Sequence, residues 1–339
     1  MGFAFFGPVF VAACSVTTPS KLACQPPGTD PPDDPTTNPP IVDGTNPSDT
    51  TDPGDTDLKS LQIFPPDNPW NQDISNAPLH PNSDAYLASI GLDTGLHPDF
   101  GTVWEGAPIG IPFAVVRSNQ TRVPVSFYYE DESDPGPYPI PSDVPIEGGA
   151  NSDGDRHVLV IDTDNRKLYE LFDAHPRADG GWEAGSGAIF DLDSNDLRPA
   201  GWTSADAAGL PIFPGLARYD EVVERGEINH ALRFTVRRTQ RAYIAPARHF
   251  ASSDTNPDLP PMGLRVRLKD DFDLSSFSPH VQVILRGLQR YGMFVSDNGS
   301  DWYITGAPDS RWDDEELSEL RRVMGRDFEA VYTGEAVTD

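Results

Sequence analysis

Cysteine is nearly absent from this chain, and its placement limits the available chemistry. Only two cysteines occur among 339 residues, Cys14 and Cys24, and both lie close to the N-terminus. Any domain that follows them contains neither a thiol nor a disulfide. Catalysis by a cysteine nucleophile is therefore excluded there.

Basic residues are also scarce. Lys and Arg number 25 against 53 Asp and Glu, which gives a formal net charge of -28 at pH 7. A field of this sign repels nucleic acid and anionic polymers unless a local arginine cluster overrides it. We therefore expect no nucleic-acid partner.

Several sequence motifs of known chemistry are missing. The chain has no P-loop, no dinucleotide-binding fingerprint and no GxSxG elbow. Its seven histidines are scattered without HxH or HExxH spacing, which argues against a zinc site. We therefore expect no cofactor beyond a structural calcium ion, which is considered below.

The N-terminus is typical of an exported lipoprotein. The apolar stretch 3–11 is too short to span a bilayer as a helix but suits a signal peptide. Small residues precede Cys14, as in a bacterial lipobox, so we expect a signal peptide over 1–13 and a lipid on Cys14. An ordinary signal peptide with a free cysteine is the alternative. The residue after Cys14 is Ser15 rather than Asp. In this the chain resembles Gram-negative lipoproteins, and the resemblance implies a location at the outer membrane or cell surface.

A polar tract follows the predicted anchor. Residues 25–57 hold nine Pro, seven Thr and eight Asp, with no Lys, Arg or aromatic residue. Such a tract buries too little apolar surface to offset the entropy of the chain. We therefore predict a disordered tether over 14–57 and a single globular domain, expected to be monomeric, over 58–335. The lipid would be its only contact with the membrane.

After Leu58 the sequence has an all-β pattern of short β-branched and aromatic runs separated by turn residues. Hairpins are predicted over 157–173 and, around Asn298-Gly299, over 293–305. Helices are predicted over 279–291 and 313–324, with shorter ones over 83–90 and 218–225. These patterns predict a mainly β fold, an antiparallel β-sandwich or jelly roll with a few peripheral helices.

The hairpin over 157–173 predicts an unusual carboxyl group. Its register places Glu170 opposite Leu159 on an apolar face, with His157 as a diagonal neighbour. Apolar surroundings raise the pKa of a carboxyl, which suits a general acid near neutral pH. The alternatives are a satisfied ion pair or a glutamate on an edge strand that faces solvent.

A second candidate group includes Asp220, Glu221 and His230, which lie close together in the sequence. Glycosidases need two carboxyls roughly 5–10 Å apart, so Asp220 or Glu221 could act with Glu170 as nucleophile or base. The alternative is a helix surface with solvated charges.

Substrate-binding candidates come from loop-like segments. Arg248 and His249 follow a predicted strand, and Trp182 and Trp202 stand next to glycines. Aromatic faces stack on sugars, although a single tryptophan in such a segment more often covers the core. Arginines could neutralise a uronate for a polysaccharide lyase with His230 or His249 as its base. The arginines concerned are Arg218, Arg248, Arg265 and Arg267, although the last two alternate as on an outward face.

Two loops have the oxygen spacing of calcium ligands: Asp191, Asp193 and Asn195, and then Asn151, Asp153 and Asp155. An EF-hand starting at Asp191 would need Gly and Glu where Asp196 and Trp202 stand. Asx turns explain both loops more simply than a structural calcium ion does.

Six segments together resemble an exported domain family of bacteria and some eukaryotes. They are DNPWN (67–71), GDRHVLVID (154–162), KLYELFDA (167–174), GWTSADAAGLPIFPGLARYDEV (201–222), LPPMGLRVRL (259–268) and DNGSDWYITG (297–306). The resemblance covers roughly residues 61–331. It implies an exported setting and a domain boundary, but no activity and no residue roles.

These observations lead to three functional hypotheses. The first is an exported, membrane-tethered, polysaccharide-degrading enzyme, a glycoside hydrolase rather than a lyase, with Glu170 as general acid. The second is a non-catalytic glycan-binding or adhesion lipoprotein. The third is a structural protein of the cell envelope. In the first two the partner is a polysaccharide.

Overall fold

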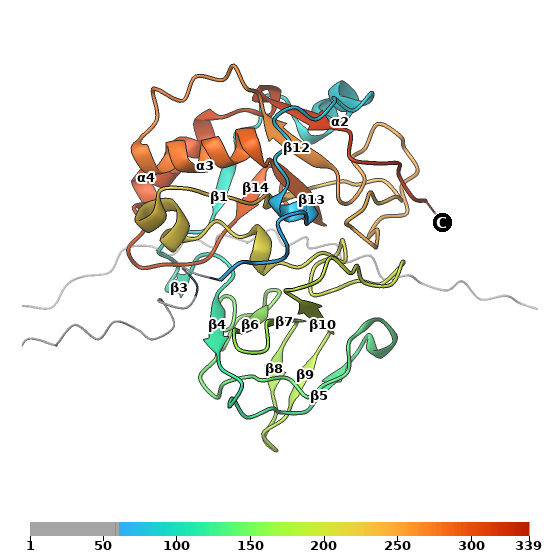
Figure 1. The fold of residues 1–339 in the computed structure, drawn as a ribbon, viewed down its shortest axis with the longest axis vertical. Helices are drawn as coiled ribbons and strands as arrows, with labels where there is room; N and C mark the ends of the chain where they lie inside the picture. The colour runs from blue at the N-terminus through green and yellow to red at the C-terminus, as the bar shows by residue number, and fades with distance from the viewer. Residues whose placement is uncertain (1–57, 59–60, 339) are drawn as a thin grey trace, which may run out of the picture. The chain divides into compact units, whose positions relative to one another are not determined.

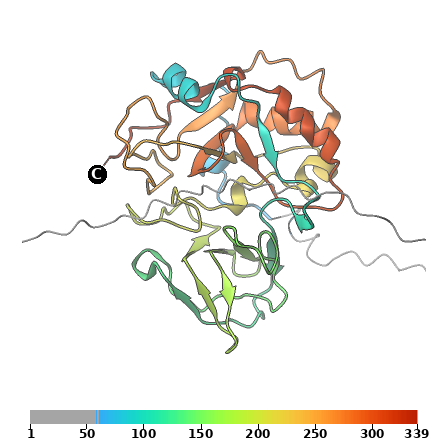
Figure 2. The same ribbon diagram turned by 180° about the vertical axis from the view of Figure 1, so that it is seen from behind.

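The computed structural model describes Leu58 and residues 61–338. The predicted signal peptide, lipidated Cys14 and tether all lie outside the described residues. The described chain is mainly β with a few helices, as the sequence predicted, and antiparallel strand pairs outnumber parallel ones (Figures 1 and 2). No helix among these residues combines the length and the apolar character needed to cross a membrane.

A six-stranded mixed sheet occupies the upper part of Figure 1. Its strands, in spatial order, are β1 (His97–Asp99), β14 (Tyr303–Thr305), β11 (Leu232–Val236), β13 (Met293–Asn298), β12 (Arg265–Leu268) and β15 (Phe328–Val331). The helix α3 (Pro279–Arg290) buries the predicted apolar stripe of Val281, Ile284, Leu285 and Leu288 in the core shared with this sheet. The helix α2 (Ser83–Ile90) packs beside β15.

A four-stranded sheet lies in the lower part of Figure 1, in the order β10 (Ser186–Asp191), β7 (Lys167–Phe172), β6 (Val158–Asp162) and β4 (Phe113–Val116). A three-stranded sheet is formed by β5 (Val125–Phe127), β9 (Trp182–Ala184) and β8 (His175–Pro176), and a separate hairpin by β2 (Val103–Trp104) and β3 (Ala107–Pro108). Alternate residues of β6 belong to two different cores: Leu159 and Ile161 to the large one, Val158 and Val160 to a smaller one. The strand is therefore buried on both faces.

Short helices connect these sheets. They are η1 (Pro69–Asn71), η2 (Glu130–Glu132), η3 (Phe213–Gly215), the π-helix η4 (Asp220–Arg225), α4 (Asp314–Ser318), η5 (Glu319–Arg322) and η6 (Gly325–Asp327). The segment 218–225 thus contains a π-helix in place of the predicted ordinary helix. The helix predicted over 313–324 is divided into α4 and η5.

The register predicted for the hairpin of β6 and β7 is confirmed, with Leu159 opposite Glu170 and Ile161 opposite Leu168. The second predicted hairpin is wrong. β13 and β14 do not pair, because β11 lies between them, parallel to β13 and antiparallel to β14. The long-range strand pairing therefore overrides the local turn signal of Asn298-Gly299.

The outward position predicted for Arg265 and Arg267 is also wrong, because both residues are buried in β12. The Arg265 guanidinium donates to the backbone carbonyls of Pro69, Gln72 and Tyr291. Burial of this arginine is tolerated because these acceptors satisfy its donors. Its charge is therefore part of the core and not of a binding surface.

Candidate functional site

Glu170 is completely buried, and its carboxylate binds the backbone. Oε2 accepts from the Ile212 amide at 2.9 Å, and Oε1 accepts from the Phe213 amide at 2.8 Å. Burial raises the pKa of Glu170 to about 7, although these two amides favour the ionised form. Glu170 lines neither the glycine-proline pocket described below nor a second, smaller pocket beside Trp70 and Arg198. Its visible role is to join β7 to the start of η3.

His157 does not pair with Glu170 but with two other groups. Its Nδ1 lies 2.6 Å from Oε2 of Glu147, and its Nε2 lies 3.0 Å from the Ala205 carbonyl oxygen. Both ring nitrogens therefore face acceptors, as an imidazolium requires. Burial opposes this charge, but the Glu147 carboxylate raises the pKa of His157 to about 9.

The second candidate group forms a closed ion network. Glu221 binds Arg218 at 2.6 Å, Arg225 at 2.7 Å and His230 Nε2 at 3.0 Å. Burial would raise the pKa of Glu221, but Arg218 and His230 lower it to about 2. Asp220 binds the same two arginines at 3.1 Å each. The carboxylates are thus neutralised within the protein, and none of these residues lines either of the same two pockets.

The predicted substrate-binding residues are largely used for packing. Trp182 is buried, and Trp202 is partly buried beside the Arg198 guanidinium. Arg248 donates to the Arg198 carbonyl, and the His249 Nδ1 lies 2.8 Å from the Ala207 carbonyl. The structure places no two of these four side chains together in a described pocket.

In the loop with calcium-like spacing that starts at Asp191, all three residues have protein partners. Asp191 pairs with Lys167, Asp193 pairs with Arg166, and the Asn195 amide donates to Asp67. Asp191 also accepts from the Asp193 amide, as in an Asx turn. In the described part of the chain, no three His, Cys, Asp or Glu side chains are arranged to hold a metal ion.

A different group of charged residues is formed by strands of the six-stranded sheet together with loops next to the four-stranded sheet. We call it the carboxylate cluster, and it contains Asp99, Glu147, Asp155, Asp206 and Asp297 around His157 and Arg233. Asp99, Arg233 and Asp297 come from β1, β11 and β13. The other four residues come from loops around β6 and after β10. Each member is linked to at least one other member by an electrostatic interaction that affects ionisation.

Arg233 is the buried centre of the carboxylate cluster. It donates to Oδ2 of Asp206 at 2.8 Å and to Oγ1 of Thr305 at 3.0 Å. Its buried Nε has no hydrogen-bond partner among the described protein groups. Such a donor calls for an acceptor, which a ligand oxygen or a water molecule can supply.

The carboxylates of the cluster differ in pKa. Burial, and then repulsion from Asp206, raises the pKa of Asp297 to about 7. Partial desolvation by the surrounding protein, and then repulsion from Glu147, also raises the pKa of Asp99, although this residue still reaches solvent. Glu147 has the opposite shift: burial would raise its pKa, but the charge of His157 lowers it. Near pH 7 the cluster therefore combines an ionised carboxyl, Glu147, with one that is still partly protonated, Asp297.

Unlike Glu170, the carboxylate cluster reaches solvent. Asp99 and Asp155 are exposed, Asp297 is partly exposed, and the Glu147 side chain is 25% exposed. Oε2 of Glu147 makes both contacts with His157, through Nδ1 and the backbone amide. This leaves Oε1 as the oxygen of Glu147 that is available to a ligand.

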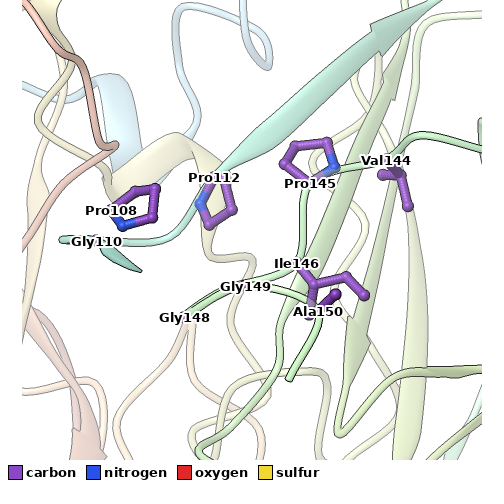
Figure 3. A pocket seen from close by; sticks show the side chains of 9 residues that line it. All are labelled: Pro108, Gly110, Pro112, Val144, Pro145, Ile146, Gly148, Gly149 and Ala150. Atoms are coloured by element: carbon purple, nitrogen blue, oxygen red, sulfur yellow. The ribbon is translucent and has the colours of Figure 1, made fainter. Parts of the chain in front are cut away.

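A cavity of about 240 Å³ adjoins the cluster, and we call it the glycine-proline pocket (Figure 3). Its wall includes Pro108, Gly110, Pro112, Pro145, Gly148 and Gly149, and small aliphatic residues complete it. Ile146 and Gly148, which both line the pocket, flank Glu147 in the sequence. On the opposite wall, Gly110 packs so closely on the Gly306 carbonyl that a Cβ there would lie 2.4 Å from the oxygen. Because Gly306 follows Thr305, the partner of Arg233, the pocket and the cluster are neighbours.

Comparison with known proteins gives no further guide to the site: no family model matches the chain, and no curated protein or solved structure matches it significantly. The resemblance to an exported domain family therefore stays a prediction.

The sequence analysis identified His157 but missed the rest of the cluster as a functional group. Asp155 was considered only as a calcium ligand. Asp206 and Asp297 lie within the segments of the predicted family resemblance, which was the one available signal. Nothing in the sequence links residues so far apart, because strand order brings them together.

Proposed function

We propose that the protein is an exported polysaccharide-degrading enzyme, a glycoside hydrolase, whose acid and base lie in the carboxylate cluster. The observation that carries the proposal is the opposite shift in pKa of Asp297 and Glu147 within one solvent-reaching cluster. Glycoside hydrolysis uses such a pair, one carboxyl protonated and the other ionised. The proposal retains the predicted lipid anchor on Cys14 and the location at the outer membrane or cell surface. It moves the acid from Glu170 to Asp297.

In this proposal Asp297 is the proton donor. As the glycosidic C–O bond breaks, its carboxyl proton passes to the leaving oxygen, which becomes a hydroxyl group. Glu147 supplies the ionised carboxylate, which either attacks the anomeric carbon or takes a proton from the attacking water. Both routes require Glu147 to be ionised when the substrate binds.

His157 is a positioning residue for Glu147. Its imidazolium fixes one carboxylate oxygen at 2.6 Å and favours the ionised form of Glu147. The second bond of the imidazole, to Ala205, fixes the orientation of the ring. The buried Nε of Arg233 still lacks an acceptor, which a water molecule can supply.

Lyase chemistry receives less support. It would need arginines free to neutralise a uronate. Instead, Arg218 binds Asp220 and Glu221, Arg248 donates to a backbone carbonyl, and Arg265 lies in the core. One observation favours the glycan-binding alternative: Trp104, at the tip of the β2–β3 hairpin, is 70% exposed. An exposed indole can stack on a sugar without any catalysis.

The proposal predicts an acidic pH optimum. We expect kcat/KM to fall as the pH rises through about 7, because Asp297 then loses the proton that it must donate. It should also fall at low pH, where Glu147 becomes protonated, below the ordinary value of 4.5 for a glutamate. The measurement is the release of reducing ends from a panel of polysaccharides between pH 3 and 9. No release from any polysaccharide, or a rate that still rises above pH 8, would reject the proposal.

A further inference from the structure

The wall of the glycine-proline pocket has no polar side chain. Its nine lining residues are glycines, prolines, Val144, Ile146 and Ala150, as Figure 3 shows. The pocket volume of about 240 Å³ lies below the range of roughly 300–1,000 Å³ that is typical for drug-sized ligands. A single sugar ring matches this size better than a disaccharide does. Proline rings offer an apolar surface to the C–H face of such a ring.

Backbone conformation keeps the pocket open. Gly110, Gly148 and Gly149 all have positive φ angles, which residues other than glycine rarely adopt. The loop that carries Gly148 and Gly149 is also anchored. Arg156 donates from Nη1 to the carbonyls of Ala150 and Ser152 and from Nε to that of Ala174. The wall is therefore held in place before a ligand arrives.

The charges beside the pocket select against anionic sugars. The cluster has only two cationic side chains against four carboxyl groups besides Asp297, the proposed proton donor, and Glu147 belongs to the loop that forms the pocket wall. Each cation also has its own carboxylate partner, Glu147 for His157 and Asp206 for Arg233. A uronate or sulfate group would meet repulsion there and find no free cation in the cluster.

From these observations we infer that the glycine-proline pocket is a subsite for one uncharged sugar unit of a neutral polysaccharide. The apolar face of the ring lies on the prolines, and its scissile bond is directed toward Glu147. This inference rests on the proposed function and defines its substrate class. It excludes glycans built from uronic acids or sulfated sugars.

The test uses Ala150→Phe in the full-length chain, which places a bulky ring at the pocket wall. Ala150 is exposed in a turn, so the variant is expected to fold. Ala178→Phe is the matched control, because Ala178 is also exposed in a turn but does not line the pocket. Affinity electrophoresis would use gels with xylan, mannan, β-glucan or arabinan, and gels with polygalacturonate or alginate. Thermal unfolding of both variants would verify that they are folded.

We expect at least one neutral polymer, and neither acidic polymer, to retard the wild type and Ala178→Phe. Ala150→Phe should bind the neutral polymer at least about tenfold more weakly. Retardation by an acidic polymer, no retardation at all, or equal binding by wild type and Ala150→Phe would overturn the subsite. Equal losses in both variants would also overturn it.

Activity separates this inference from the proposed function. If the wild type cleaves a neutral polymer and Ala150→Phe binds it normally, the hydrolase stands and the subsite is wrong. If binding depends on Ala150 but the wild type cleaves no polymer, the subsite stands and the hydrolase is wrong.

Discussion

Replacing Asp297 by Asn lowers kcat/KM for polysaccharide hydrolysis by about 10²–10⁴-fold, the usual contribution of a general acid. The amide has nearly the same shape but no proton to donate at neutral pH. Folding should not suffer, because burial and Asp206 already disfavour the charge of Asp297. The measurement is the initial rate of reducing-end release, with the unfolding midpoint measured on the same sample.

Asp254→Asn is the control for this variant. Asp254 is a surface carboxylate that pairs with exposed Arg238, outside the carboxylate cluster. Its variant should retain the wild-type rate. If Asp297→Asn hydrolyses within about threefold of the wild type, Asp297 is not the proton donor.

Replacing Glu221 by Ala should have its main effect on stability. The change removes a buried carboxylate from Arg218, Arg225 and His230, and breaking a buried ion network by one partner costs about 3–5 kcal/mol. We expect the free energy of unfolding in urea to fall by about this amount. Below the unfolding transition, kcat/KM should be unchanged, because Glu221 lies outside the carboxylate cluster.

The contribution of Glu221 to the free energy of unfolding also depends on pH. The pKa of Glu221 is depressed to about 2, so its stabilisation is present above the ordinary value of 4.5 and is lost as the pH falls through about 2. Glu183→Ala, at an exposed position on β9, is the control and should change stability by less than about 0.5 kcal/mol. Loss of activity in a fully folded Glu221→Ala variant would contradict the structural role.

Local signals in the sequence were sufficient for part of the fold. The hairpin of β6 and β7 follows from alternating residues around one turn, and α3 from a helical apolar stripe. The β13–β14 hairpin failed because β11, from a distant segment, pairs with both strands. Local turn chemistry does not reveal such an insertion.

For the candidate site too, the sequence predicted local features but not long-range contacts. The register of β6 and β7 correctly predicted that Glu170 is buried on an apolar face. Its partners, the amides of Ile212 and Phe213, lie more than forty residues away and were not predictable. They change its interpretation from a candidate acid in an active site to an internal support for η3.

The carboxylate cluster was beyond sequence reasoning for a related reason. Asp99 and Asp297 lie at or next to the ends of their strands. An acidic residue at such a position usually predicts a turn that is exposed to solvent. Only the tertiary structure brings the loops with Glu147 and Asp206 close to these strands. Burial and repulsion from Asp206 then raise the pKa of Asp297, whereas the charge of His157 lowers the pKa of Glu147.

The central claim is that acid–base chemistry belongs to the carboxylate cluster and not to buried Glu170. Its most direct test is the kcat/KM of Glu170→Gln on the polysaccharide that the wild type cleaves. Gln retains an oxygen that can accept from the Ile212 and Phe213 amides, so the fold should persist. We predict a rate within about threefold of the wild type. A folded Glu170→Gln protein that has lost hydrolysis would contradict the account and return the role of acid to Glu170.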